Sequence, residues 1–303
     1  MTHAAEPRGP RVSVIAPAYH SDATMGSFLE GLRRQRFRDF EAIVVNSSSD
    51  ARTREIVVER LSEARFVQWP SRLLPHAARN RGVDVAHGEL LVFTDPDCRP
   101  APDWLERLVA RSDQGHDVVV GAVDFGGQST YERGVHLWKY AAWLPKSTAG
   151  PCAVAPSANV LYSRRAWEAV GPFPEDGYSG DTVLAWRAAA SGHRPWFEPN
   201  AIVTHLGTRE SCLGKSFERG ADFARLRALH ERRGRLWAAA RLAALPAIPF
   251  VLAARTARNA VAAGWGTVFA RTLPVQFGGA SAWALGEART HLRLVARGAR
   301  GLS

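Results

Sequence analysis

The sequence predicts an α/β protein, with a doubly wound, mixed but mainly parallel sheet flanked by helices and followed by a helical C-terminal segment. Short apolar runs alternate with stretches of helical periodicity over the first two thirds of the chain, which is typical of parallel sheets with helices on both faces. The composition then changes near residues 232–234, where a basic and apolar region begins. We therefore expect an α/β domain over residues 10–232 and a helical region over residues 233–303.

The alternation begins with a strand at residues 12–16, an apolar run that stops at Pro17. A helix at 24–36 follows, because its apolar residues recur on one side. The strand at 90–94 is a continuous apolar run that ends abruptly in polar residues, as expected of a buried strand. The same reasoning gives further strands at 40–45, 64–69 and 117–123, and helices at 53–61, 76–86 and 104–111.

The pattern becomes looser beyond residue 125. Tyr131 begins an aromatic-rich stretch that we expect to be helical as far as residue 143. The remaining expected elements are strands at 154–162 and 195–204, and helices at 164–170 and 181–191. These elements complete the α/β domain.

Composition limits the setting of the protein. The first 11 residues are polar and lack the apolar core of a signal peptide. The three cysteines (Cys98, Cys152 and Cys212) are far apart and form no Cys-x-x-Cys pair, which favours neither a zinc site nor a disulfide framework. We expect a reducing, cytoplasmic location.

The charge of the protein is concentrated at its C-terminal end. Residues 206–303 contain 16 Lys+Arg against 5 Asp+Glu, whereas residues 1–205 contain 23 against 24. A basic region attracts nucleic acid or an anionic membrane. The apolar stretches 236–254 and 265–285 favour the membrane, and no nucleic-acid-binding module accompanies the charge.

Both apolar stretches approach the roughly 20 residues that a bilayer span needs, but arginines and prolines interrupt them. We therefore expect helices that lie on or re-enter the inner face of the cell membrane, with arginines against the anionic leaflet. The alternative is a buried helical hairpin of a soluble protein.

An Asp-x-Asp triplet follows the apolar run at residues 90–94. Asp95 and Asp97 at the carboxyl end of a strand can face one crevice, where open α/β sheets place their ligands. Mg²⁺ or Mn²⁺ is bound by carboxylates together with substrate phosphates. The alternative is an ordinary turn, since Asp and Pro are common turn residues.

Further motifs occur in a fixed order around this triplet. They are VSVIAPAY at 12–19, ARNRG at 78–82, GELLVFTDPD at 88–97, SANVLYSRR at 157–165 with VGPF at 170–173, and GDTVLAWR at 180–187 with EPNAIVTH at 198–205. Together, over roughly residues 10–230, the chain resembles the family 2 glycosyltransferases, which have the GT-A fold. The resemblance implies inverting transfer of a sugar from a nucleotide-sugar donor to an acceptor hydroxyl.

The resemblance also implies roles for individual residues on the donor side. The nucleotide is expected against Pro17, Ala18 and Tyr19, with Asn46 or Ser47 hydrogen-bonding the base, and with Arg79 and Asn80 close to the donor. An arginine fork suits phosphate oxygens, although Arg79 could equally form a surface salt bridge.

The remaining expected roles concern metal and catalysis. Asp97 is the expected metal ligand and Asp95 lies nearer the sugar or ribose; His205 ends a strand where some relatives have a further ligand. Asp181 occupies the place of the catalytic base, and its alternative role is to cap the helix that follows. A lone histidine such as His205 is also often structural.

The sequence departs from the family at two places. Residues 46–50 read NSSSD where two acidic residues are usual, and the acidic pair near the base is reduced to Asp181. The Gln-x-x-Arg-Trp sequence of processive members is missing, so addition of a single sugar is expected. The acceptor is expected to be lipid-linked or a cell-surface glycan precursor. The alternatives are a nucleotidyltransferase of similar fold and a catalytically silent scaffold of glycan assembly.

Overall fold

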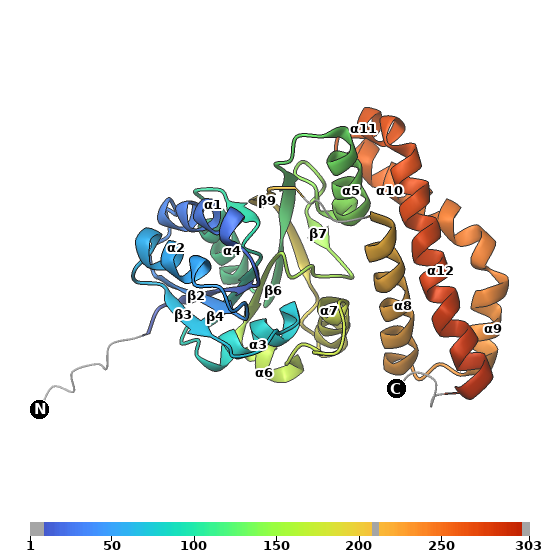
Figure 1. Cartoon of the computed structure of the whole chain (residues 1–303), viewed down its shortest axis with the longest axis horizontal. Helices are drawn as coiled ribbons and strands as arrows, with labels where there is room; N and C mark the ends of the chain where they lie inside the picture. Colours follow the sequence, from blue (N-terminus) through green and yellow to red (C-terminus); the bar gives the residue numbers. More distant parts are fainter. Residues whose placement is uncertain (1–8, 208–211, 299–303) are drawn as a thin grey trace, which may run out of the picture.

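The computed structural model describes residues 9–207 and 212–298. It shows a central sheet with helices on both faces, and a group of long helices packed beside it (Figure 1). The sheet order is β3-β2-β1-β4-β8-β6-β9-β5, with β7 added beside β9. The expected α/β architecture is confirmed.

The first half of the sheet is entirely parallel, with adjacent strands in the order β3-β2-β1-β4. Its elements are β1 (Val12–Ala18), α1 (Asp22–Arg33), β2 (Phe40–Asn46), α2 (Arg52–Arg60), β3 (Arg65–Gln68), α3 (Pro75–Asp84) and β4 (Leu90–Thr94). Each of them was expected from the sequence pattern, within a few residues at the ends.

The second half of the sheet is mixed. Its elements are β5 (Cys98–Pro100), α4 (Trp104–Asp113), β6 (Val118–Phe125), α5 (Thr130–Tyr140), the 3₁₀ helix η1 (Ala141–Trp143), β7 (Gly150–Pro151), β8 (Asn159–Ser163), α6 (Arg164–Val170), α7 (Gly180–Ala190) and β9 (Trp196–His205). Strand β8 runs antiparallel to both β4 and β6, whereas β9 is parallel to β6. The sheet is therefore mainly parallel only in its first half.

Two expectations for this half were wrong in detail. The strand expected from residue 154 begins only at Asn159, because a turn closed by the Asn159 N–H and the Pro156 carbonyl precedes it. The short strands β5 and β7 were not expected, since three or two residues carry too little periodicity to be recognised.

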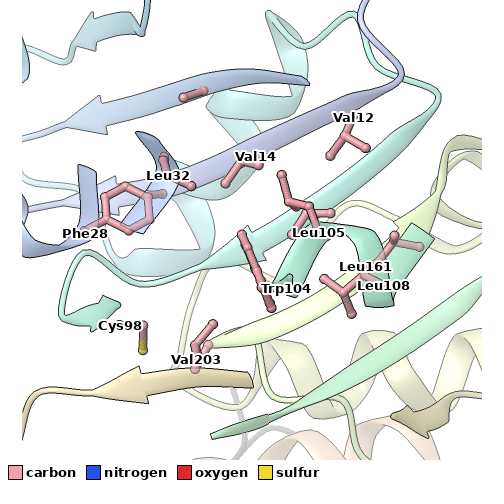
Figure 2. Close-up of a cluster of buried hydrophobic side chains, with 14 of the residues drawn as sticks. Val12, Val14, Phe28, Leu32, Cys98, Trp104, Leu105, Leu108, Leu161 and Val203 are labelled. Atoms are coloured by element: carbon pink, nitrogen blue, oxygen red, sulfur yellow. The ribbon is translucent and has the colours of Figure 1, made fainter. Parts of the chain in front are cut away.

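Two hydrophobic layers cover the two faces of the sheet. On one face Val12 and Val14 of β1 pack with side chains of α1, α2 and α4, and Figure 2 shows Phe28, Leu32 and Trp104 in this layer. The other face packs against α3, α6 and α7. Strands buried on both faces read as unbroken apolar runs, which explains why they were visible in the sequence.

The region from residue 233 is helical, as expected. It contains α9 (Arg235–Ala243), the 3₁₀ helix η2 (Leu245–Ala247), α10 (Ile248–Ala262), α11 (Gly266–Arg271) and α12 (Leu273–Arg297). Helix α8 (Cys212–His230), which was not expected, precedes it. The last five residues of the predicted region, 299–303, lie outside the described residues.

Helices α8 and α12 lie side by side along most of their length (Figure 1). A Cβ at Gly220 would lie 2.2 Å from the Trp283 carbonyl oxygen, and one at Gly286 would lie 2.1 Å from that of Phe217. Glycine is thus required at both positions for this close approach. Helix α8 therefore packs with the helical region, although it precedes the change in composition at residue 232.

Within the described residues, no single helix is both long and apolar enough to cross a bilayer. By length and composition alone, α9 together with residues 245–262 would meet that test as a pair bent by 51°. The predicted membrane contact stays a prediction.

Candidate active site

A cavity of about 1040 Å³ opens at the carboxyl ends of β1 and β4 and extends toward the C-terminal helices. This is the edge of the sheet where α/β proteins bind ligands. The predicted site residues that line it are Pro17, Ala18, Tyr19, Ser47, Arg79, Asp95, Asp97, Asp181 and His205. Fold and local sequence together thus bring nine of the predicted residues to one cavity.

The donor side of the cavity follows the end of β1. Tyr19 is 42% exposed, and the guanidinium carbon of Arg72 lies 4.7 Å from the centre of its ring. Ser47 lies beside β1, where its N–H donates to the Ala18 carbonyl at 2.9 Å. Arg72, on the loop between β3 and α3, also lines the cavity. A flat aromatic ring with a cation over it and a nearby hydroxyl can hold a nucleobase.

Two predicted donor residues are not brought to the cavity. The Asn46 amide donates to the Ser48 carbonyl at 3.1 Å and to the Gln68 side chain at 3.0 Å, so it fixes the turn after β2. The Asn80 amide donates to the Phe173 carbonyl at 2.9 Å and accepts from the Phe173 N–H at 3.1 Å. Both side chains are buried, and their hydrogen bonds stabilise the fold.

Asp97 and His205 are neighbours because of strand register. Cys98 lies directly opposite His205 in the antiparallel pair of β5 and β9. His205 Nε2 is therefore 3.5 Å from an Asp97 carboxylate oxygen, and the Leu206 N–H donates to the Asp97 carbonyl at 2.8 Å. Residues that are 108 positions apart in the sequence thus meet at one corner of the cavity.

Asp95 has a different partner. It forms an ion pair with Arg79, whose side chain is only 2% exposed. Burial raises the pKa of the Asp95 carboxyl, and the negative charge of Asp97 adds to this effect although Arg79 opposes it. Arg79 was predicted near the donor, with a surface salt bridge as the alternative; it lies in the cavity wall and pairs with a carboxylate there.

The donor atoms at this corner suit a divalent cation with oxygen ligands. Ligand atoms of Asp95, Asp97 and Cys98 all lie within 4.8 Å of one another. Burial and the two carboxylates raise the pKa of the Cys98 thiol well above its usual value, so it is protonated and a poor ligand. The carboxylates remain, and they are the ligands that Mg²⁺ and Mn²⁺ prefer.

His205 fits such a site only with one change. Its Nδ1 accepts the Gly207 N–H at 3.3 Å, which places the ring proton of the neutral form on Nε2. Ligation through Nε2 needs that proton on Nδ1, so the Gly207 contact would have to rearrange.

Asp181 lies in the first turn of α7. The helix begins at Gly180 and its N-cap residue is Ser179, so Asp181 is not the cap. One carboxylate oxygen accepts the Thr182 N–H at 2.7 Å and the other accepts the Ser157 N–H at 3.2 Å. Backbone N–H groups thus hold both oxygens of this carboxylate in place in the cavity wall.

A side chain of α8 holds the loop that leads to Asp181. One oxygen of Asp222 accepts the N–H groups of Tyr178 and Ser179, each at 2.8 Å. Arg225 pairs with the other Asp222 oxygen at 3.0 Å and with Asp176 at 2.7 Å. The helical region thus fixes the loop that precedes the candidate base.

Three residues of the site were not found from the sequence: Arg72, His76 and Asp222. His76 lines the cavity, and burial lowers its pKa while the charge of Asp181 opposes the shift. Its spacing of three residues from Arg79 on α3 was the one available signal, since such residues share a helix face. Arg72 lies on a loop without periodicity, so no pattern indicated it. Asp222 belongs to α8 and holds a loop of the α/β domain, and the sequence pattern does not indicate a contact between these two regions.

Comparison with known proteins identifies the family. The family model of Glycosyl transferase family 2 matches residues 13–171. The chain is 30% identical over 206 residues to the glycosyltransferase AglE of Haloferax volcanii, covering 65% of this chain and 67% of that protein. The chain therefore belongs to glycosyl transferase family 2, and it is a glycosyltransferase.

Two further relatives extend the comparison. A solved structure, the mannosyltransferase PcManGT of Pyrobaculum calidifontis in complex with GDP-Man and Mn²⁺, has a TM-score of 0.59 at 23% identity, covering 88% of this chain and 86% of that one. It shows that the fold is of the GT-A type. The undecaprenyl-phosphate 4-deoxy-4-formamido-L-arabinose transferase of Pseudomonas paraeruginosa is 32% identical over 129 residues, 40% of this chain and 38% of that protein.

Proposed function

We propose that this chain is an inverting, metal-dependent, non-processive glycosyltransferase that moves a sugar from a nucleotide-sugar donor to a lipid-linked acceptor. One observation carries the proposal: Asp95, Asp97, Asp181 and Arg79 line a single cavity at the carboxyl edge of the sheet. A carboxylate pair for a metal and a separate carboxylate for a base are the parts that such a transfer requires.

On the donor side, Tyr19, Ser47 and Arg72 hold the nucleotide in this proposal, and Asp97 with Asp95 holds Mg²⁺ or Mn²⁺. The bound ion would neutralise charge on the diphosphate as it leaves. The binding of GDP-Man and Mn²⁺ by the structural neighbour PcManGT supports this arrangement. Asn46 and Asn80 contribute indirectly, because their side chains hold backbone segments beside the cavity.

On the acceptor side, Asp181 takes the proton of the acceptor hydroxyl. The acceptor oxygen then attacks the anomeric carbon from the face opposite the diphosphate, the bond from that carbon to the diphosphate oxygen breaks, and the nucleoside diphosphate leaves. One displacement of this kind inverts the anomeric configuration. The absence of a Gln-x-x-Arg-Trp sequence favours transfer of one sugar at a time.

The acceptor and the location belong together in this proposal. The basic C-terminal region and its apolar helices favour a site of action at the inner face of the cell membrane. The similarity to a transferase whose name specifies undecaprenyl phosphate supports a lipid-linked acceptor. A nucleotidyltransferase loses its support, since the chain belongs to a glycosyltransferase family.

The test is a screen of nucleotide sugars with purified full-length protein and Mn²⁺. We expect one donor to bind and to be consumed, and we expect chelation to abolish both. Asp97→Asn should lose nearly all turnover, because a lost ligand charge weakens both metal binding and stabilisation of the leaving group. Asp84→Asn, on the exposed end of α3, is the matched control and should behave as wild type. Turnover that survives excess chelator excludes the metal role, and no turnover of any donor favours the silent scaffold.

A further inference from the structure

The cavity continues well beyond the donor side. It extends into a trough lined by one face of α8 and by α9 and α10. Its volume of about 1040 Å³ is slightly above the roughly 300–1,000 Å³ that is usual for a pocket that binds one small molecule. The trough therefore leaves room for a second ligand next to the donor.

One wall of the trough is cationic. Lys215, Arg219, Phe223 and Arg227 follow one another at intervals of four residues on α8, and all four line the cavity. Residues of this spacing lie on one side of a helix. Gly220 lies on a different side, against α12, so the packing of the two helices directs the cationic stripe into the trough.

The charges on this wall are only partly compensated. Lys215 lies 3.7 Å from Glu218, and Arg227 pairs with Glu231 at 3.0 Å. Arg219 has no hydrogen-bond or ion-pair partner among residues 9–207 and 212–298. An arginine in a cavity wall that pairs with no anion of the described residues can bind the anion of a ligand.

The other wall is largely apolar. It consists of Ala244 and Ala247, between α9 and α10, and of Ile248, Val251, Leu252, Arg255, Thr256 and Asn259, which share one face of α10. Arg241 of α9 also lines the cavity, where it pairs with Glu287 at 2.6 Å. Val251 is 63% exposed, and an exposed apolar side chain in a cavity wall favours the binding of an apolar ligand there. Arg255 marks the point where this face becomes polar, and it too has no ion pair among the described residues.

We propose that this trough is the acceptor subsite, and that it binds the phosphate of an anionic lipid on Arg219 and its neighbours while the lipid chain lies along α10. The inference rests on the proposed transferase function and specifies its acceptor. A neutral lipid would leave Arg219 and Arg255 without a counter-charge, and a soluble glycan would leave the apolar wall unused. In a lipid phosphate, the phosphate pairs with the cationic wall and the alkyl chain packs against the apolar wall.

The direct test measures the binding of dodecyl phosphate to the full-length protein by isothermal titration calorimetry. The ligand is kept below its critical micelle concentration. Dodecyl maltoside supplies a chain without phosphate, and inorganic phosphate supplies the anion without a chain. We expect dodecyl phosphate to bind at least about 10-fold more tightly than either, because a charge-assisted hydrogen bond and the buried chain each contribute that much or more.

Two variants test the two walls. Arg219→Gln should weaken the binding of dodecyl phosphate by about 10-fold, the loss expected for one hydrogen bond to a charged group. Val251→Ser should weaken the binding of dodecyl phosphate but leave the affinity for inorganic phosphate unchanged. Arg258→Gln, on an exposed side of α10 outside the cavity, is the matched control. Arg255→Gln serves as a second cationic variant if Arg219→Gln does not fold.

The outcomes separate this inference from the proposed function. Equal binding of dodecyl maltoside, or wild-type affinity in both Arg219→Gln and Arg255→Gln, overturns the subsite. Donor affinity with Mn²⁺ is measured separately: a loss in Arg219→Gln would assign this arginine to the donor diphosphate. Failure of the wild type to bind any donor would remove the transferase proposal while leaving the lipid-phosphate result intact.

Discussion

The three carboxylates of the cavity differ in their immediate neighbours, and these neighbours separate their roles. Asp95 is neutralised by the buried Arg79, Asp97 faces His205, and Asp181 accepts two backbone N–H groups at the start of α7. Asp95 and Asp97 belong to one cluster of candidate metal ligands, and Asp181 is not part of it. This separation favours Asp181 as the group that takes the proton.

At the residue scale we expect Asp181→Asn to lower turnover by about 10²–10⁴-fold, the usual contribution of a general base. Donor affinity should change little, because the amide keeps the shape and one acceptor oxygen. Steady-state kinetics together with donor titration give both quantities, and Asp84→Asn again controls for the substitution. Unchanged turnover would assign Asp181 to holding Ser157 and the start of α7.

At the scale of elements, a hydrophobic cluster of α5, α10 and α11 and several polar contacts join the helical region to the α/β domain. Asp222 on α8 holds the N–H groups of Tyr178 and Ser179, and a Cβ at Gly177 would lie 2.3 Å from its carboxylate. The loop before Asp181 therefore follows any displacement of α8. Asp222 does not line the cavity, so its effect on the reaction is one of positioning.

We expect Asp222→Ala to lower kcat by about 10- to 100-fold with little change in the KM for the donor, because a small displacement of a catalytic group has effects of this size. Asp222→Asn keeps one acceptor oxygen and should recover part of the rate. A purely structural role would instead lower the midpoint of thermal unfolding and leave kcat of the folded protein at the wild-type value.

Within the helical region, a polar contact joins α9 to α12. The Glu287 carboxylate accepts from Arg241 at 2.6 Å and from the Trp283 indole at 2.8 Å, and its side chain is buried. Burial by itself would raise the pKa of Glu287, but the neighbouring His291 and the hydrogen bonds from Arg241 and Trp283 outweigh it, and the pKa lies below its usual value. A carboxylate of lowered pKa stabilises the fold above the unfolded-state pKa of about 4.3, and this contribution disappears as the pH falls through the folded-state pKa.

We expect Glu287→Gln to lower the free energy of unfolding at pH 7 by about 1–3 kcal/mol, because Arg241 loses its charged partner. The difference from wild type should shrink as the pH is lowered below about 4. Urea unfolding across this range measures it, with the exposed Glu55→Gln on α2 as control. A difference that is independent of pH would contradict the role of the ionised carboxylate.

At the scale of the whole molecule, charge and exposed apolar surface gather in the same region. Leu236 on α9 is 89% exposed and Phe250 on α10 is 66% exposed, and residues 206–303 carry the excess of arginine. Apolar helix faces flanked by arginine are typical of proteins that bind an anionic membrane surface. Such a surface would also bring the mouth of the trough close to lipid.

We expect the full-length protein to sediment with vesicles that contain phosphatidylglycerol, and to be released only in part by high salt, since salt screens the arginines but not apolar burial. The double variant Leu236→Asp and Phe250→Asp should stay in the supernatant. Val58→Asp on α2, at a side chain that is 58% exposed, is the matched control. Sedimentation of the double variant at the wild-type level would exclude these side chains from the contact.

Much of the protein was predictable from the sequence because the signals are local. The strands are apolar runs, the helices are periodic, and Asp95 and Asp97 directly follow a buried strand. Parallel strands place their carboxyl ends at one edge, so these motifs identified both the fold class and the position of the cavity. The order of the motifs identified the family.

The tertiary structure decided which polar groups are available to a ligand. Asn46 and Asn80 follow the family pattern, yet Gln68 and Phe173, which lie elsewhere in the sequence, occupy their amides. His205 meets Asp97 through the register of β5 and β9, and the stripe on α8 faces the cavity because α12 covers another side of that helix. Contacts of this kind depend on how segments that are distant in the sequence pack together. A local pattern of residue types does not determine that packing.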